Sequence, residues 1–319
     1  MKAIRYHRHG GPEVLQLDEI PEPAPGPGEA RVTVRAAGLN FIDTYLRSGL
    51  YPSPLPSVAG KEGAGVVDAV GPGVEGLKPG DRVAFFDAQG SYAEQVLMKA
   101  ERLLPLPDGL GFHDGAALPL QGMTAHYLTH TIRPLRPGDR VLIHAVAGGV
   151  GLLATQMAKL AGAEVFGTCS SEEKAERARE AGADHVILYN RDDFVDEVLK
   201  RTGEGVDLVI DGVGKTTFLG SVRATRLRGH VILFGQSSGV PDPIVPRQVL
   251  GSRTLTSASL FDYVRTADEL RERAAVVFDW AVSGRIRATI DRVLPLEKAA
   301  DSHRLLESRQ TSGKVILEP

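Results

Sequence analysis

The chain contains few residues of several types, and each shortage excludes a class of protein. Its 319 residues include one cysteine, one tryptophan and four methionines. The single cysteine, Cys169, permits no intrachain disulfide and cannot build a zinc site from several cysteines. The sequence therefore excludes a small disulfide-stabilised domain and a multi-cysteine zinc protein.

An excess of positive charge is also missing. The chain carries 37 Lys and Arg against 40 Asp and Glu, for a formal net charge of -3 at pH 7. Nonspecific binding to phosphate backbones or to anionic lipid needs a basic surface, which this balance does not provide. We therefore expect no nucleic acid as a principal partner.

Long apolar runs are absent as well. The most apolar stretch, residues 141–163, is interrupted by His144, Gln156 and Lys159, so it does not predict a membrane span. The opening MKAIRYHRHGG contains neither an apolar run nor a small-residue cleavage site. We expect a cytoplasmic protein that does not bind membranes.

The length and the pattern of short strands predict two domains. A chain of 319 residues is roughly twice the usual domain size. Its first hundred residues alternate short apolar runs with Gly and Pro clusters, a pattern typical of a small β-barrel or sandwich. The strands predicted there are residues 2–6, 31–37, 64–70, 82–86 and 91–98.

From about Arg140 the pattern changes to apolar strands separated by helical segments, which predicts a doubly wound parallel sheet. Its predicted strands are residues 140–145, 164–168, 185–189, 206–211, 230–234 and 254–257. The tail predicts a helix over 262–283, a strand over 290–294, a helix over 296–307 and a strand over 314–317. We assign most of this tail to the first domain, which the sheet domain then interrupts.

A glycine-rich turn follows the first strand of this sheet. The segment HAVAGGVG places Gly148, Gly149 and Gly151 between an apolar strand and an amphipathic helix. Glycines allow the backbone to approach a pyrophosphate, which the amides at the start of the helix attract. Ala145 replaces the first glycine of the commoner fingerprint, so the motif is a variant. It predicts a dinucleotide site, and the alternative is a tight turn without a ligand.

The end of the next strand predicts which dinucleotide is bound. An NAD site usually has an acidic residue there, and that residue would repel a 2′-phosphate. Here the strand is followed by neutral residues, and Ser170, Lys174 and Tyr189 are candidate phosphate contacts, so the sequence favours NADPH over NADH. In the alternative interpretation Ser170 and Glu173 form a helix capping box and Lys174 is a solvated charge.

Several motifs together identify a family resemblance that covers essentially the whole chain. They are MKAIRYHRHGGPEVL, AAGLNFIDTYLRSGLYP, AGKEGAGVV, LQGMTAHY, HAVAGGVG, LFGQSSG and SRQTSGKVIL. With these motifs the chain resembles the zinc-free quinone oxidoreductases (zeta-crystallin-like) of the medium-chain dehydrogenase/reductase superfamily. The resemblance implies a GroES-like β-barrel catalytic domain, residues 1–122 and 265–319. It also implies a Rossmann NADPH-binding domain, residues 123–264, and a homodimer.

Zinc alcohol dehydrogenases of the same superfamily hold a catalytic metal with Cys, His and Cys. At similar positions this sequence has Asn40, Lys61 and Gln121, so we expect no metal site. Without a Lewis acid, hydride transfer needs an acceptor that is already electrophilic. A quinone or an enone has this property.

The resemblance also implies individual roles for residues. Asn40, Tyr45 and Tyr51 would line the nicotinamide and acceptor pocket as the catalytic residues. The residues implied to bind the cofactor are Thr124, Ala147, Gly148, Gly149, Val150, Gly151, Ser170, Lys174, Tyr189, Phe234, Gly235, Gln236 and Arg309. In the alternative interpretation Tyr45 and Tyr51 pack on the surface and Arg309 forms a salt bridge.

These observations predict an NADPH-dependent quinone reductase that transfers hydride without a metal, with solvent supplying the proton. Two alternatives stay open. One is an alkenal or enoyl reductase that acts on an activated carbon–carbon double bond, and the other is a sensor or structural protein that binds NADPH without turnover.

Overall fold

The computed structural model describes residues 1–319, which form two compact units. The first unit comprises Met1–Leu120, Thr266–Gly284 and Ala288–Pro319, and the second comprises Gln121–Arg265 and Arg285–Arg287. The second unit is therefore inserted in the sequence of the first. None of the helices combines the length and the hydropathy that crossing a membrane requires.

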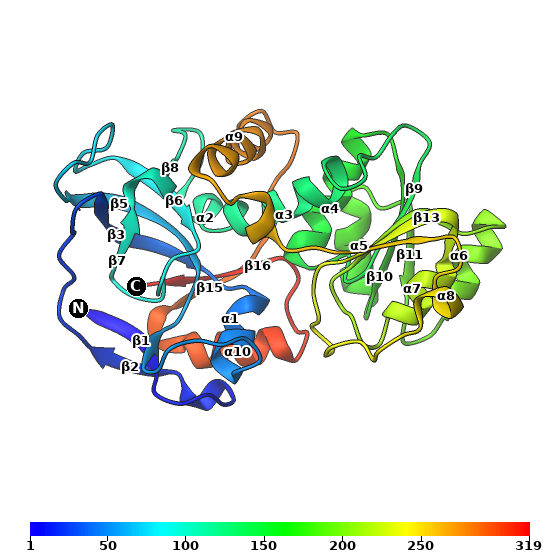
Figure 1. Ribbon diagram of the computed structural model, residues 1–319, viewed down its shortest axis with the longest axis horizontal. Coiled ribbons are helices and arrows are strands. Elements are labelled where there is room, and N and C mark those ends of the chain that lie inside the picture. The colour runs from blue at the N-terminus through cyan, green and yellow to red at the C-terminus, as the bar shows by residue number, and fades with distance from the viewer. The chain divides into compact units, whose positions relative to one another are not determined.

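The first unit is built on two sheets (Figure 1). One sheet has the strand order β15-β16-β3-β5-β6-β8 with β7 paired to β3, and the other has the order β2-β1-β4. All pairs are antiparallel except β15 with β16. The strands are β1 Lys2–Tyr6, β2 Gln16–Glu19, β3 Glu29–Gly38, β4 Ser57–Val58, β5 Glu62–Val70, β6 Arg82–Phe86, β7 Gln95–Lys99, β8 Leu104–Pro105, β15 Ile290–Pro295 and β16 Lys314–Glu318.

Alternation along β3 explains how this unit builds its core. Ala30, Val32 and Val34 are buried, while the residues between them are partly exposed. A strand with this period of two buries one face against neighbouring elements. The buried face continues into Phe85 and Val315 of other strands to form one apolar cluster. The helices of this unit are α1 Phe41–Ser48, α2 Phe112–Gly115, α9 Ala267–Val282 and α10 Ala299–Glu307.

The second unit is a six-stranded sheet with the order β11-β10-β9-β12-β13-β14, and every pair in it is parallel. The doubly wound sheet predicted from the sequence is thus confirmed. The strands are β9 Arg140–Ile143, β10 Glu164–Cys169, β11 His185–Leu188, β12 Val206–Asp211, β13 Thr225–Leu233 and β14 Thr254–Ser257. The helices are α3 Leu118–His130, which begins in the first unit, α4 Gly149–Leu160, α5 Glu172–Glu180, α6 Phe194–Thr202, α7 Phe218–Ala224 and α8 Pro246–Val249.

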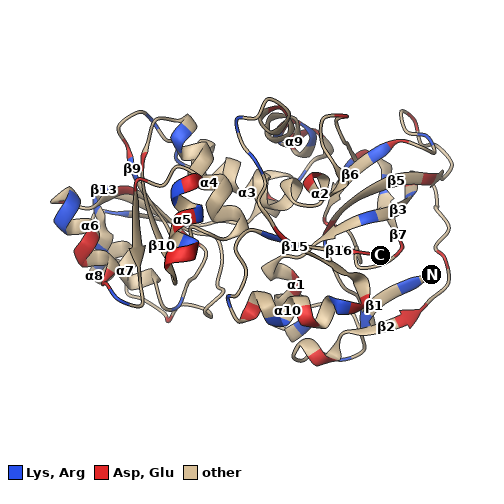
Figure 2. Cartoon of the chain, turned by 180° about the vertical axis from the view of Figure 1, so that it is seen from behind, with Lys and Arg blue, Asp and Glu red and all other residues tan.

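Helices cover both faces of this sheet. Helices α4 and α5 pack together on one face, and α6 and α7 pack together on the other (Figure 1). Because both faces are covered, the central strands are continuously apolar, as in Leu208, Val209 and Ile210 of β12. Helix α5 carries Lys and Arg interspersed with Glu (Figure 2).

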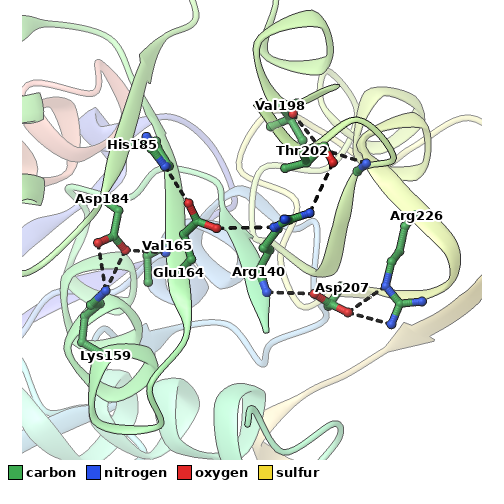
Figure 3. Close-up of polar contacts among 11 residues, drawn as sticks. Arg140, Lys159, Glu164, Val165, Asp184, His185, Val198, Thr202, Asp207 and Arg226 are labelled. Carbon is green, nitrogen blue, oxygen red and sulfur yellow. Dashed lines mark hydrogen bonds and ion pairs between the residues drawn. The ribbon is translucent and has the colours of Figure 1, made fainter. Parts of the chain in front are cut away.

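Charged side chains bind the amino ends of the strands to one another. The backbone N–H of Arg140 donates to Asp207 at 2.8 Å, and its guanidinium lies 3.4 Å from Glu164 (Figure 3). Asp207 also accepts from Arg226, and Glu164 contacts His185 at 2.8 Å. The opposite edge, with the carboxyl ends of the strands, is where sheets of this kind bind ligands.

Some predicted boundaries are wrong, and for two of them the structure shows a local reason. Strand β9 ends at Ile143 because Ala145 has a φ of 50° and starts the turn. Helix α9 begins at Ala267 rather than 262 because Thr266 and Glu269 form a capping box there. Strand β7 begins at Gln95 instead of 91, and β13 begins at Thr225 instead of 230.

Candidate functional site

The glycine-rich turn connects β9 to α4 in the second unit. Gly148 is the N-cap of α4, and its backbone N–H donates to the carbonyl of Ala145 at 2.8 Å. The amides of the first helical turn, which include those of Val150 and Gly151, have no acceptor within the helix. They therefore face the edge of the sheet as donors, together with the positive end of the helix dipole.

Close contacts surround two of the glycines, and only at Gly151 is the neighbour backbone. A Cβ on Gly151 would lie 2.5 Å from the carbonyl oxygen of Ala145 and 2.6 Å from that of Val146. A Cβ on Gly149 would lie 1.9 Å from Oε1 of Gln121. A side chain at Gly151 would thus push α4 away from β9, whereas at Gly149 it would meet a movable side chain. The turn fits a pyrophosphate that needs close backbone approach.

The loop after β10 contains Ser170, but Ser170 is not the residue that caps the following helix. Ser171, not Ser170, is the N-cap of α5, and its hydroxyl accepts from the backbone N–H of Lys174. The predicted capping box of Ser170 with Glu173 is therefore wrong. The structure leaves Ser170 partly exposed, and Lys174 lies in the first turn of α5.

The acidic residues beside this loop are paired with arginines. Glu172 accepts from Arg179 at 2.6 Å, and Glu173 lies 3.5 Å from Arg177. Their charges are therefore offset within α5 itself. Tyr189, whose backbone N–H donates to the carbonyl of Cys169, is 42% exposed beside the loop. The structure thus brings Ser170, Lys174 and Tyr189 to neighbouring strand ends, with no carboxylate at the tip of β10.

The remaining residues predicted for the second unit lie on two other elements. Phe234, Gly235 and Gln236 directly follow β13, and the N–H of Phe234 donates to the carbonyl of Asp211 at 3.0 Å. Thr124 lies on α3 and is 5% exposed.

Sequence reasoning missed a buried polar chain beneath the glycine turn. Nδ1 of His144 lies 2.9 Å from the hydroxyl of Thr168, and its Nε2 lies 3.0 Å from that of Ser221. Ser221 in turn donates to Asp211 at 2.7 Å. The signal in the sequence was the position of His144, a polar residue at the end of an apolar strand.

In the first unit, the side chain of Asn40 is buried and fully engaged. Its Nδ2 donates to Glu62 at 2.8 Å and to the carbonyl of Gly38 at 3.2 Å, and its Oδ1 accepts from Lys314 at 2.8 Å. Its backbone N–H donates to Asp43, which closes the capping box of α1. Asn40 is 4% exposed, and its hydrogen bonds hold the start of α1 in place.

The two predicted tyrosines lie side by side, Tyr45 on α1 and Tyr51 just after the end of this helix. The rings of Tyr45 and Tyr51 are 5.3 Å apart and meet edge to face at 63°. The N–H of Tyr51 donates to the carbonyl of Tyr45 at 3.1 Å, which fixes the turn between them. Tyr51 is 39% exposed, so the pair presents aromatic surface that a flat ring can contact.

A pocket of about 230 Å³ lies in the first unit next to α1. A dry cavity of about 150 Å³ holds benzene, so this volume is sufficient for one ring. Its lining includes Asp43, Leu46, Pro52 and Lys61 but none of the three predicted catalytic residues. Burial raises the pKa of Asp43 to about 6, although bonds from Asn40 and Tyr92 oppose this shift.

Arg309, also in the first unit, follows α10 in a turn. It is exposed and has a φ of 58°, and its N–H donates to the carbonyl of Leu306 at 3.1 Å. The left-handed backbone directs the chain from α10 toward β16.

The residues at the family's zinc positions do not fit zinc. Asn40 offers an amide that is already bonded, and Nζ of Lys61 donates to Asp87 at 3.4 Å. Gln121 offers a second amide. Zinc sites in proteins use thiolate, imidazole or carboxylate ligands, and no group of three or more His, Cys, Asp or Glu side chains in the structure could hold a metal. Burial raises the pKa of Cys169, whose thiol lies at the end of β10.

Comparison with known proteins gives consistent relatives. Residues 26–108 match the alcohol dehydrogenase GroES-like domain, and residues 149–277 match the zinc-binding dehydrogenase domain. The chain is 43% identical to a quinone oxidoreductase of Pseudomonas aeruginosa over 100% of this chain and 99% of the relative. It is 41% identical to a 2-haloacrylate reductase of Burkholderia over 99% of this chain and 98% of the relative.

Solved structures agree with these relatives. The quinone oxidoreductase of Escherichia coli, complexed with NADPH, has a TM-score of 0.97 at 40% identity, and the match covers 100% of both chains. The expected fold class, a GroES-like domain with a Rossmann parallel-sheet domain, is confirmed.

Proposed function

We propose that this chain, which belongs to the zinc-free quinone oxidoreductases of the medium-chain dehydrogenase/reductase superfamily, reduces quinones with NADPH. The observation that carries the proposal is the turn from β9 to α4, where Gly151 leaves no room for a Cβ. The uncharged tip of β10 supports NADPH over NADH, and the E. coli relative was solved with NADPH.

In this proposal residues 123–264 bind the dinucleotide. The amides of Gly148 to Gly151 receive the pyrophosphate, and Ser170, Lys174 and Tyr189 receive the 2′-phosphate. The nicotinamide half lies along Phe234, Gly235 and Gln236, since ligands of such sheets bind at the carboxyl ends of the strands. Thr124 lines the cofactor site, and Arg309 contributes a phosphate contact.

Residues 1–122 and 265–319 then form the catalytic domain. Bound NADPH supplies the hydride. Tyr45 and Tyr51 stack against the flat acceptor, and Asn40 holds α1 so that the two rings keep their orientation. Because the donor set at Asn40, Lys61 and Gln121 does not suit a metal, orientation and an electrophilic acceptor replace Lewis-acid activation. The proton comes from solvent.

A second candidate function is reduction of an activated carbon–carbon double bond. The observation that favours it is the 41% identity to a 2-haloacrylate reductase over almost the full chain. The same hydride donor serves both reactions, so the acceptor alone separates them.

The experiment is turnover of NADPH by the purified protein with a panel of quinones and of enals or acrylates. We expect quinone-dependent loss of NADPH absorbance that chelator leaves unchanged. Activity abolished by chelation and restored by zinc would contradict the proposal. Product analysis with an enal identifies the second candidate, and tight NADPH binding with no turnover on any acceptor identifies a sensor or structural protein.

We also propose, from the family resemblance, that the protein is a cytoplasmic homodimer. Light scattering coupled to gel filtration tests the dimer, since a monomeric mass at micromolar concentration would contradict it. Cell fractionation tests the compartment.

A further inference from the structure

A buried series of hydrogen bonds connects the side chains of Thr168, His144, Ser221 and Asp211. This series joins β9, β10 and β12, and the loops proposed to bind the cofactor begin where these strands end. The four side chains come from β10, the end of β9, α7 and β12, and none is more than 3% exposed. Burying polar side chains costs free energy, and a buried polar network is stable when each of its members is hydrogen-bonded. Here each contact is 3.0 Å or shorter.

The acceptors in this chain determine where its hydrogens lie. The carboxylate of Asp211 can only accept, and the hydroxyls of Ser221 and Thr217 donate to it at 2.7 and 2.8 Å. The Ser221 hydroxyl has two acceptors apart from His144, Asp211 at 2.7 Å and the carbonyl of Thr217 at 3.0 Å. With its hydrogen on either of them, Oγ of Ser221 accepts from Nε2–H of His144. Nδ1 of His144 is then the unprotonated nitrogen and accepts from the hydroxyl of Thr168. The imidazole is thus fixed in one tautomer.

The ring is also held in place by packing. Phe194 of α6 lies edge to face against it, with the ring centroids 4.8 Å apart at 82°. Burial lowers the pKa of His144, although the charge of Asp211 opposes this shift. Neutral imidazole is the form that this hydrogen-bond pattern needs.

Each end of this hydrogen-bonded series is bonded to a loop. The carbonyl of Thr168 accepts from the N–H of Val146 in the glycine turn at 3.0 Å, and Ser170 follows two residues later. At the other end, Asp211 accepts from the N–H groups of Val213 and Gly214 at 2.9 and 3.0 Å. His144 itself directly precedes Ala145, where the glycine turn begins.

We propose that His144 is a positioning residue for the dinucleotide, which holds the loops after β9, β10 and β12 in the arrangement that NADPH binds. The inference rests on the proposed function, because it concerns the same site. His144 has no contact with the cofactor in this proposal and acts through Thr168 and Ser221. It holds the glycine turn, which receives the pyrophosphate that NADPH and NADH share, so its loss weakens both nucleotides. Any displacement of Ser170 after β10 adds to the loss for NADPH alone.

The test compares isosteric variants by titrating NADPH and NADH separately into the full-length protein. Thr168→Val removes the donor to Nδ1, and Ser221→Ala removes the acceptor of Nε2–H. We expect the Kd of both nucleotides to rise about tenfold in each variant, the scale of one buried hydrogen bond. Thr168→Ser, which keeps the hydroxyl, restores the Kd to within about twofold of the wild type.

Thr225→Val is the matched control. Thr225 is fully buried and its hydroxyl donates to the carbonyl of Ser221 at 2.7 Å, but it begins β13 at the amino edge of the sheet. It should lower the Tm about as much as Thr168→Val while leaving both Kd values unchanged. Nitrogen NMR shifts of His144 should show a protonated Nε2 and an unprotonated Nδ1.

Wild-type affinity in both Thr168→Val and Ser221→Ala, or a proton on Nδ1, would overturn the positioning role. An equal loss of affinity in Thr225→Val would also overturn it, because general destabilisation would then explain the effect. A wild-type protein that binds neither nucleotide would instead refute the proposed function itself.

Discussion

Lys314 donates to Oδ1 of Asn40 at 2.8 Å although 274 positions separate the two residues in the chain. The ammonium also bonds Glu62, which accepts from Nδ2 of Asn40. The side chains of Lys314 and Glu62 are 1% and 0% exposed. Because the lysine can only donate and the carboxylate can only accept, the pair determines which way the Asn40 amide faces.

Removing Lys314 should leave the charge of Glu62 buried without compensation. We expect Lys314→Met to lower the free energy of unfolding by about 3–5 kcal/mol, the usual cost of breaking a buried pair. Urea denaturation measures this. The double variant Lys314→Met with Glu62→Gln removes both charges and should recover part of the loss. A single variant as stable as the wild type would contradict the role of the pair.

Two buried groups in the first unit should give opposite dependences of stability on pH. The folded pKa of Asp43 is raised by burial from 3.8 to about 6, so its contribution to stability is lost as the pH rises through this window. Burial lowers the pKa of His303 from 6.5 to about 3, so its contribution is lost as the pH falls from 6.5. Between about pH 4 and 6 the two slopes oppose each other and largely cancel.

Asp43→Asn should expose the histidine slope. Its free energy of unfolding should rise relative to that of the wild type by about 1.4 kcal/mol per pH unit between pH 4 and 6. Asparagine keeps an oxygen for the donors Asn40 N–H and Tyr92 O–H, so the bonds themselves are retained. Urea denaturation at pH 4, 5 and 6 measures the difference, and parallel curves would show that Asp43 does not titrate in this range.

Gly151→Ala should affect both stability and cofactor binding, whereas Gly148→Ala should affect mainly binding. The Cβ at Gly151 would lie 2.5 Å from a backbone oxygen, so α4 must shift, at a cost of about 1–3 kcal/mol. At Gly148 the nearest atom would be 3.2 Å away and φ is -77°, which alanine adopts. Thermal unfolding and NADPH titration of both variants test this contrast, and equal Tm losses would refute it.

The sequence predicted best what depends on neighbouring residues. The glycine turn needs only a strand, three glycines and a helix in succession, and the six parallel strands follow from alternating apolar and helical segments. Helix boundaries do not follow from local sequence in this way, because Ser170 and Ser171 are both chemically suited to cap α5 and only the backbone conformation selects Ser171.

Contacts between distant segments were not predictable in this way. The family resemblance implies a catalytic role for Asn40, but nothing in the sequence indicates that Lys314 and Glu62 bond its side chain. Likewise, His144 and Ser221 are 77 positions apart, so the chain that joins them to Asp211 appears only in the folded sheet. Such pairings depend on which strands become neighbours, and local patterns carry no such information.

Lys174→Ala should distinguish NADPH from NADH. Lys174 lies in the first turn of α5, where its backbone N–H bonds Ser171, so the substitution leaves the cap intact. We expect NADPH binding to weaken by roughly 1–3 kcal/mol, the scale of a hydrogen bond to a charged group, with almost no change for NADH. Lys200→Ala removes the same charge from α6 as a control, since its exposed side chain pairs with Glu197. Equal losses for the two nucleotides in Lys174→Ala would place the 2′-phosphate elsewhere.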